Sequence, residues 1–214
     1  MVEAEVAPQF QMKILLTGKG GVGKTSLRDQ FVKNTFREDR VPTLGVEFLN
    51  KSLTVNETTV RAQVWDTAGQ EFHKALSPIY FRGASGALLI FSVTERESLE
   101  CIDRWITEIS TYSGDIPTIL IGNKSDLINE RVIPTDEGQR FAKERGLAYM
   151  ETSAKTASNV QQAFERLVEK VLSSKVQTLK KTETPKTPIQ SGNKIDTTPI
   201  ALKPAEPKPK KKCC

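Results

Sequence analysis

The chain has 214 residues, of which 37% are hydrophobic, and its 31 basic and 26 acidic side chains give a net charge of +5. No stretch approaches the about 20 consecutive apolar residues of a membrane-spanning helix, which excludes an integral helical membrane protein. Residues 1–11 lack the apolar segment of a secretion signal, and the three cysteines form neither a disulfide framework nor a zinc-binding spacing. We therefore expect an intracellular protein.

The first pattern along the chain is a glycine-rich loop between a strand and a helix. Met12–Leu16 is an apolar run typical of a buried strand, residues 18–25 fit G-x-x-x-x-G-K-[ST], and residues 26–34 carry apolar side chains at helical spacing. Such a loop directs backbone N–H groups and the helix dipole at phosphate, while its lysine reaches the outer phosphates and its threonine binds Mg²⁺. The alternative is a glycine turn beside a stray lysine. The predicted phosphate-binding residues are Gly18, Gly20, Gly21, Val22, Gly23, Lys24, Thr25 and Ser26.

Strands and helices alternate along the rest of the chain. After a polar loop at residues 35–42, residues 43–49 lead into a strand through Leu53, and residues 59–65 alternate in polarity, which predicts an antiparallel pair joined near Asn56–Glu57. We further expect strands at 87–91, 118–121 and 148–150, and helices at 98–112 (capped by Ser98), 135–144 and 159–172. This order predicts an α/β fold with a doubly wound, mostly parallel sheet and one antiparallel edge strand.

Three polar clusters follow predicted strands, at the strand ends where doubly wound sheets bind ligands. Asp66 ends the strand at 59–65 and is the acid expected near Mg²⁺, with a turn cap as the alternative. Residues 123–126, Asn-Lys-Ser-Asp, place Asp126 where its carboxylate can accept hydrogen bonds from both donors on the guanine edge, a pair that adenine lacks. Residues 151–155 offer a backbone N–H to the guanine carbonyl. Together these clusters predict a Mg²⁺-dependent site for GTP or GDP.

On these motifs the chain resembles a small GTPase of the Ras superfamily over residues 10–174, with the P-loop NTPase architecture of a small G domain. Within that superfamily it is most similar to the Rab branch, through residues 45–48, 65–71 and 80–83 and the terminal Cys-Cys. Residues 43–51 are most similar to the late-endosomal Rabs. The resemblance implies hydrolysis of GTP to GDP.

The resemblance also implies residue roles in hydrolysis and switching. Gln70 would be the catalytic residue that orients the attacking water. Thr43 would bind Mg²⁺ together with Thr25 and Asp66, and Gly69 would donate its N–H to the γ-phosphate. Loss of that phosphate would relax the segments around Thr43 and Gly69, so that effectors recognise only the GTP state.

For the base, the resemblance implies an aromatic ring on one side and a lysine stem on the other. Phe36 would stack on guanine, Ala154 would donate its N–H to the guanine oxygen, and Asn123 would brace the surrounding loops. The predicted guanine-binding residues are Phe36, Asn123, Lys124, Asp126, Ser153, Ala154 and Lys155.

Partner recognition carries its own predictions. Phe48, Trp65 and Tyr80 match the aromatic triad through which Rab partners read the switch, although the same residues could simply be core. Lys19 in the glycine loop and Phe72–His73 after the Gln-Glu pair depart from the usual Rab pattern. These departures do not affect the residues predicted to bind the nucleotide, but they bear on which exchange factors and effectors recognise the chain.

The C-terminal residues have a different composition from the rest. Residues 175–214 hold ten lysines and three acidic residues, a charge of +7, which leaves −2 for residues 1–174. We expect flexible residues at 1–9, a GTPase domain at 10–174 and a disordered basic tail at 175–214. Cys213 and Cys214 are similar to the doubly prenylated terminus of Rabs, and the lysines before them favour an anionic membrane. The tail has no aromatic residue for base stacking, so we expect no nucleic-acid partner.

The resemblance implies an exchange factor, a GTPase-activating protein, effectors, an escort protein and a dissociation inhibitor as partners. It places the chain on the cytoplasmic face of an intracellular membrane, endosome or Golgi, with cycling through the cytosol. Two alternatives are a nucleotide-locked scaffold, which the intact Thr43 and Gln70 disfavour, and a P-loop nucleotide kinase, which would leave residues 123–126 without a role.

Overall fold

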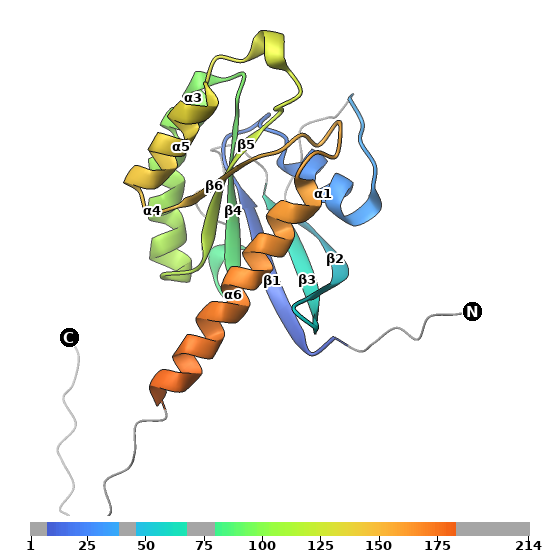
Figure 1. Cartoon of the computed structure of the whole chain (residues 1–214), viewed down its shortest axis with the longest axis vertical. Coiled ribbons are helices and arrows are strands. Elements are labelled where there is room, and N and C mark those ends of the chain that lie inside the picture. Colours follow the sequence, from blue (N-terminus) through green and yellow to red (C-terminus); the bar gives the residue numbers. More distant parts are fainter. Residues whose placement is uncertain (1–7, 39–45, 68–79, 183–214) are drawn as a thin grey trace, which may run out of the picture. The chain divides into compact units, whose positions relative to one another are not determined.

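The computed structural model describes residues 8–38, 46–67 and 80–182, which form a six-stranded sheet with helices on both faces (Figure 1). The strand order is β2-β3-β1-β4-β5-β6, and among the described strands only β2 and β3 pair antiparallel. The strands are β1 (Phe10–Thr17), β2 (Val46–Val55), β3 (Thr58–Thr67), β4 (Gly86–Ser92), β5 (Thr118–Asn123) and β6 (Ala148–Glu151). The helices are α1 (Lys24–Lys33), α3 (Arg96–Glu100), α4 (Ile102–Ser113), α5 (Thr135–Glu144) and α6 (Val160–Thr182), with a 3₁₀ turn at Ile128–Glu130. The predicted fold class is confirmed.

Alternating side chains of the central strands divide the core into two layers. Leu16 and Ile90 face α1 and α6, where Phe31 and Phe164 stack with ring centroids 3.8 Å apart. Leu15 and its neighbours face the opposite layer, formed by α3, α4 and α5. Both faces of the sheet are therefore covered, and the described loops that follow β1, β5 and β6 meet at the carboxyl ends of these strands.

The β2–β3 hairpin turns at the predicted residues. Val55 pairs with Thr58, and the two residues between them, Asn56 and Glu57, have φ angles of 47° and 63°. Two successive residues with positive φ are typical of a type I′ turn, whose twist matches that of the flanking strands. The turn fixes the register that places Glu47 opposite Asp66 at the far end of the hairpin.

The helix predicted at residues 98–112 is two helices, and Ser98 is not its N-cap. Helix α3 begins at Arg96 and ends before Cys101, where α4 takes over. The buried Ser98 hydroxyl donates to the carbonyl of Glu95 at 2.6 Å and accepts the N–H of Ser92 at 3.0 Å. Ser98 therefore ties α3 to the end of β4, a contact that local capping rules cannot anticipate.

Helix α6 is longer than the sequence predicts. It runs through Thr182, so residues 175–182, expected to begin the disordered tail, are helical in backbone. Residues 183–214, including Cys213 and Cys214, lie outside the described residues. No described helix is long and apolar enough to span a membrane.

A tyrosine of β6 occupies space that two glycines leave open. A Cβ atom on Gly122 would lie 2.7 Å from the Tyr149 hydroxyl oxygen, and one on Gly138 would lie 2.5 Å from it. The hydroxyl itself donates to Glu151 at 2.9 Å. The side chain thereby packs β5, α5 and β6 together beneath the loop that follows β6.

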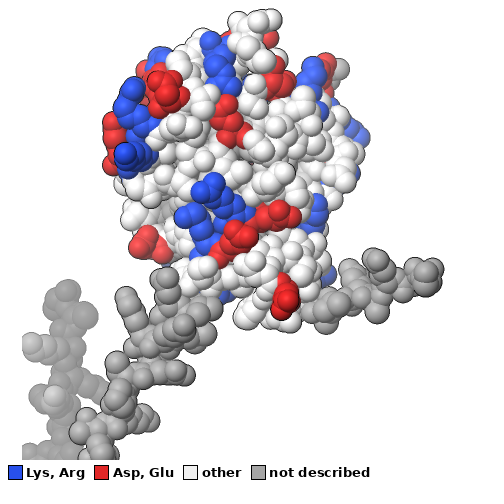
Figure 2. Space-filling model, in the orientation of Figure 1, with Lys and Arg blue, Asp and Glu red and all other residues white. Residues whose placement is uncertain are grey.

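Charged side chains of the described surface are paired across neighbouring helices. Arg145 binds Asp103 of α4 at 2.7 Å, and Arg96 of α3 binds Glu137 of α5. Basic and acidic groups are interspersed on the face shown in Figure 2. The +5 charge of the whole chain is therefore not a property of that face.

Candidate nucleotide-binding site

The glycine loop between β1 and α1 has a backbone that only glycine adopts easily. Gly18 has a φ of 140°, and a Cβ atom there would lie 2.0 Å from the carbonyl oxygen of Ile90. Gly23 has a φ of 96°, and its Cβ would lie 2.4 Å from the side-chain nitrogen of Asn123. The loop is thus pressed between β4 and the end of β5, and α1 begins immediately after it, with the free N–H groups of a helix N-terminus at the loop.

The side chain of Lys24 reaches from the start of α1 back to the first residues of the glycine loop. Its buried ammonium donates to the carbonyls of Gly18 and Lys19, each at 2.8 Å. Burial lowers the pKa of Lys24 to about 8, while the nearby Asp66 acts in the opposite direction. At neutral pH the lysine remains mostly charged, so the loop presents a desolvated cation to an anionic ligand.

Asp66, at the end of β3, faces the first turn of α1. It is fully buried, and Thr25 donates its hydroxyl to Asp66 Oδ2 at 2.5 Å. Asp66 Oδ1 is buried and has no hydrogen-bond partner among the described residues. Burial raises the pKa of Asp66, and the Thr25 hydrogen bond and the Arg28 charge oppose that rise.

The residues around Asp66 fit Mg²⁺. A carboxylate and a hydroxyl are hard oxygen ligands, and Mg²⁺ is usually held by one or two carboxylates together with water and phosphate oxygens. The described residues contain no group of three or more carboxylate, histidine or cysteine side chains placed to hold a metal ion, so they offer no all-protein cage. The unpartnered Asp66 oxygen is the feature that Mg²⁺, or a water bound to it, would use.

Asn123 joins the loops after β1, β5 and β6. Its amide nitrogen donates to the carbonyl of Val22 at 2.8 Å, and its amide oxygen accepts the hydroxyl of Thr152 at 3.2 Å. The N–H of Ser125 also donates to the carbonyl of Thr152 at 3.1 Å. The structure shows the bracing contacts expected for Asn123, while its contribution to guanine binding stays a prediction.

An ion pair that the sequence did not reveal supports the loop after β6. Arg131 donates to both carboxylate oxygens of Glu151, at 2.9 and 2.8 Å, and Tyr149 donates to the same carboxylate. Burial alone would raise the pKa of Glu151, but these hydrogen bonds outweigh it and lower the pKa. Since Glu151 directly precedes Thr152 and Ser153, the bidentate pair fixes the start of the predicted guanine loop.

We expect Glu151→Gln to lower the free energy of unfolding by about 2 kcal/mol, because the amide keeps the shape of the side chain but not its charge-assisted bonds to Arg131. Urea unfolding of the GDP-free chain measures this loss. The matched control is Glu137→Gln, which removes the equally bidentate but exposed pair with Arg96 and should change stability little. Equal losses in the two variants would contradict a special role for Arg131 and Glu151.

The other predicted guanine residues lie around the same edge of the sheet. Ser153 and Ala154 are buried in the loop after β6, and Phe36 is half-buried against the α1 and α6 layer. Lys155 pairs with Glu38 at 2.6 Å, which links the loop after β6 to the segment after α1. Thr43, Gly69 and Gln70, like Phe72 and His73, lie outside the described residues, so their predicted roles stay predictions.

Two of the predicted effector-facing aromatics stack on the β2–β3 hairpin, and we call this pair the aromatic platform. Phe48 is 47% exposed, Trp65 is half-buried, and their ring centroids lie 5.0 Å apart. The ammonium of Lys13 lies 4.2 Å from the Trp65 ring centroid. Tyr80 is half-buried and packs, like Trp65, against the core layer formed by α3, α4 and α5. Phe48 is thus not a core residue, although contact with a partner stays a prediction.

Lys19, which departs from the Rab pattern, has carboxylate partners outside the glycine loop. Its ammonium pairs with Glu95, which directly precedes α3, and at 2.6 Å with Glu97 in the first turn of α3. These two hydrogen bonds raise the pKa of Lys19 far above its usual value. The basic residue therefore ties the loop to the segment after β4 and is not aimed at the ligand.

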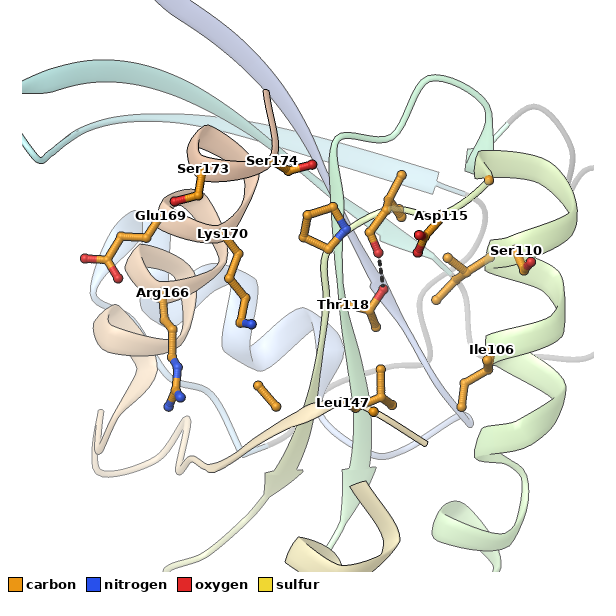
Figure 3. A pocket seen from close by; sticks show the side chains of 16 residues that line it. Ile106, Ser110, Asp115, Thr118, Leu147, Arg166, Glu169, Lys170, Ser173 and Ser174 are labelled. Carbon is orange, nitrogen blue, oxygen red and sulfur yellow. Dashed lines mark hydrogen bonds between the residues drawn. The ribbon is translucent and has the colours of Figure 1, made fainter. Parts of the chain in front are cut away.

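A cavity of about 800 Å³ lies at a different place, beneath the start of β5 and β6. Lys170 and Arg166 of α6 border it on one side and Asp115 and Ile106 on the other (Figure 3). None of the predicted nucleotide-binding residues lines it. The predicted nucleotide-binding residues that the structure describes lie instead at the carboxyl ends of the strands.

Comparison with known proteins agrees with this geometry. Residues 13–173 match the family model described as "Ras family". The chain is 38% identical to "Ras-related protein RGP2" of Oryza sativa subsp. japonica over 209 residues, which covers 96% of this chain and 94% of that protein. It is 42% identical over 163 residues both to "Ras-related protein Rab11A" of Lotus japonicus, covering 76% of this chain and 72% of the relative, and to "Ras-related protein RABA1b" of Arabidopsis thaliana, covering 76% of each. These names do not bear on the late-endosomal resemblance, which stays a prediction.

Proposed function

Because this chain belongs to the Ras family of small GTPases, with Rab proteins among its relatives, we propose that it is a Rab-type switch in vesicle trafficking. As a GTPase it hydrolyses GTP to GDP. In the proposed cycle it binds GTP with Mg²⁺, recruits effectors to a membrane in that state and releases them after hydrolysis. The observation that carries the proposal is the junction of the loops after β1, β5 and β6, which Asn123 at the end of β5 holds together through Val22 and Thr152.

The described residues support distinct roles in this cycle. Backbone N–H groups of the glycine loop and the buried ammonium of Lys24 bind the phosphates, because both present positive charge in a desolvated setting. Thr25 and Asp66 would hold Mg²⁺. When bound, Mg²⁺ neutralises charge on the phosphate oxygens. Asp126 and the loop at 152–155 select guanine.

Hydrolysis and switching rest on residues outside the described part of the chain. Gln70 orients the attacking water, while Thr43 and the N–H of Gly69 contact the γ-phosphate in the GTP state only. Phe48 lies on β2, which begins just after the segment that contains Thr43, and Trp65 lies on β3, which ends just before the segment that contains Gly69 and Gln70. In the proposed cycle, a partner reads the nucleotide state through the aromatic platform together with these neighbouring segments of the chain.

We expect Gln70→Leu to slow single-turnover GTP hydrolysis on the order of tenfold, equivalent to about 1.4 kcal/mol of transition-state stabilisation, with little change in affinity for GDP. The reason is that water positioning acts in the transition state and not in nucleotide binding. The rate of hydrolysis is measured from the phosphate released by protein that has been preloaded with GTP. A parent chain that binds GTP but never hydrolyses it would favour the nucleotide-locked scaffold instead.

The C-terminal residues complete the proposal. Cys213 and Cys214 would carry geranylgeranyl groups, and the lysines at 210–212 would add attraction to an anionic leaflet. This combination would hold the chain at the cytoplasmic face of an endosomal or Golgi membrane. An escort protein would deliver it for prenylation, a dissociation inhibitor would carry it through the cytosol, and an exchange factor and a GTPase-activating protein would set its nucleotide state. We expect no nucleic-acid partner.

A further inference from the structure

Arg28, on the first turns of α1, is a buried cation beside the predicted metal site. Its side chain is 4% exposed, and Nη1 lies 3.4 Å from Asp66 Oδ2 and 3.1 Å from Glu47 Oε2. Its Nε donates to Asp29 at 3.0 Å. Arginine is almost never buried without paired charges, and these three carboxylates come from α1, β2 and β3.

The contacts of Arg28 overlap those of the metal site. Asp66 Oδ2 accepts the Thr25 hydroxyl and forms an ion pair with Arg28 Nη1, while Asp66 Oδ1 has no hydrogen-bond partner among the described residues. The guanidinium therefore helps to fix the rotation of the carboxylate through the oxygen that is already paired. It also places a permanent positive charge next to a fully buried acid.

We infer that Arg28 is a positioning residue of the metal site that makes GDP binding by this chain less dependent on Mg²⁺. The inference rests on the proposed function. Without Mg²⁺, the Asp66 carboxylate and the nucleotide phosphates repel one another, and Arg28 supplies a cation that stays beside Asp66. With Mg²⁺ bound, the same charge repels the metal, so that more Mg²⁺ is needed to saturate the site.

Nucleotide release measures this effect without reference to hydrolysis. The full chain is loaded with fluorescent GDP, and its release into excess unlabelled GDP is followed in millimolar Mg²⁺ and in excess EDTA. The ratio of the EDTA rate to the Mg²⁺ rate should rise about tenfold in Arg28→Met, a neutral side chain of comparable length. Arg28→Lys should restore most of the parent ratio, because it keeps the charge.

The chain offers a matched control in Glu47, whose side chain is 65% exposed. Glu47→Gln removes one partner of Arg28 but leaves the contact with Asp66, so its ratio should stay close to that of the parent. Equal ratios in Arg28→Met and the parent would overturn the inference, and Arg28 would then have only a structural role in packing α1 against β2 and β3. It is overturned as well if Arg28→Met and Arg28→Gln both fail to bind GDP even in millimolar Mg²⁺, since Arg28 is then needed for the site as a whole. A parent chain that binds no GDP would overturn the proposed function instead.

Discussion

Replacement of Asp126 by asparagine should weaken GDP binding by about 10²- to 10⁴-fold. The carboxylate is expected to accept two charge-assisted hydrogen bonds from guanine, each worth about 1.5–3 kcal/mol. Asparagine retains one acceptor but turns an N–H₂ group towards the N–H₂ of the base, so that one bond becomes a clash of two donors. Competition against labelled GDP measures the loss.

The same substitution should improve binding of xanthosine diphosphate, whose 2-oxo group accepts the new N–H₂ donor. The gain separates a change of base specificity from simple damage to the site, because damage would weaken both nucleotides. Adenosine diphosphate serves as the control on the parent chain, which should bind it far more weakly than GDP. If Asp126→Asn and the parent bind GDP equally well, Asp126 does not contact the base.

Gly18→Ala should lower the free energy of unfolding by about 4 kcal/mol or more, among the largest losses expected of a single methyl group. The new Cβ would lie 2.0 Å from the backbone oxygen of Ile90 in the fully buried strand β4, where no flexible side chain can give way. The strand or the glycine loop must move, and nucleotide binding should fail with it. Thermal unfolding and GDP titration report the two losses.

The matched control is Gly83→Ala. Gly83 also has a positive φ, 74°, but nothing lies within 4 Å of its would-be Cβ. This variant should lose only the about 1–2 kcal/mol that a left-handed conformation costs an L-residue, and it should still bind GDP. If Gly18→Ala lowers the free energy of unfolding no more than Gly83→Ala does, the glycine loop can move away from Ile90 at little cost.

The fold could be predicted because its signals are local. Continuous apolar runs mark the buried strands, and the hairpin turn at Asn56–Glu57 needs no distant contact. The division between α3 and α4 could not be predicted, since it depends on the bonds of the Ser98 hydroxyl to β4. The extension of α6 to Thr182 is hidden for a different reason: residues 175–182 include good helix formers, but they are continuous in sequence with the lysine- and proline-rich tail, and composition groups them with it.

The site could be predicted where its residues stand in short motifs. Lys24, Thr25 and Asn123 belong to such motifs, and the structure places the first two in the first turn of α1 and Asn123 at the end of β5, bonded to the glycine loop through Val22. The roles of Arg28 and Arg131 could not be predicted, because Glu47 lies 19 residues from Arg28, Glu151 lies 20 residues from Arg131, and no sequence pattern joins either pair. Charge pairs across elements become visible only once the sheet has brought the elements together.

The packing of Tyr149 against two glycines has a consequence for how this domain can vary among its descendants. A side chain at position 122 or 138 would collide with the phenol, while a smaller residue at 149 would leave a void beside the Arg131–Glu151 pair. A side chain at 122 or 138 can therefore be accommodated only after residue 149 has become smaller. The three positions would have to change in that order, through a variant with a void where the phenol stood.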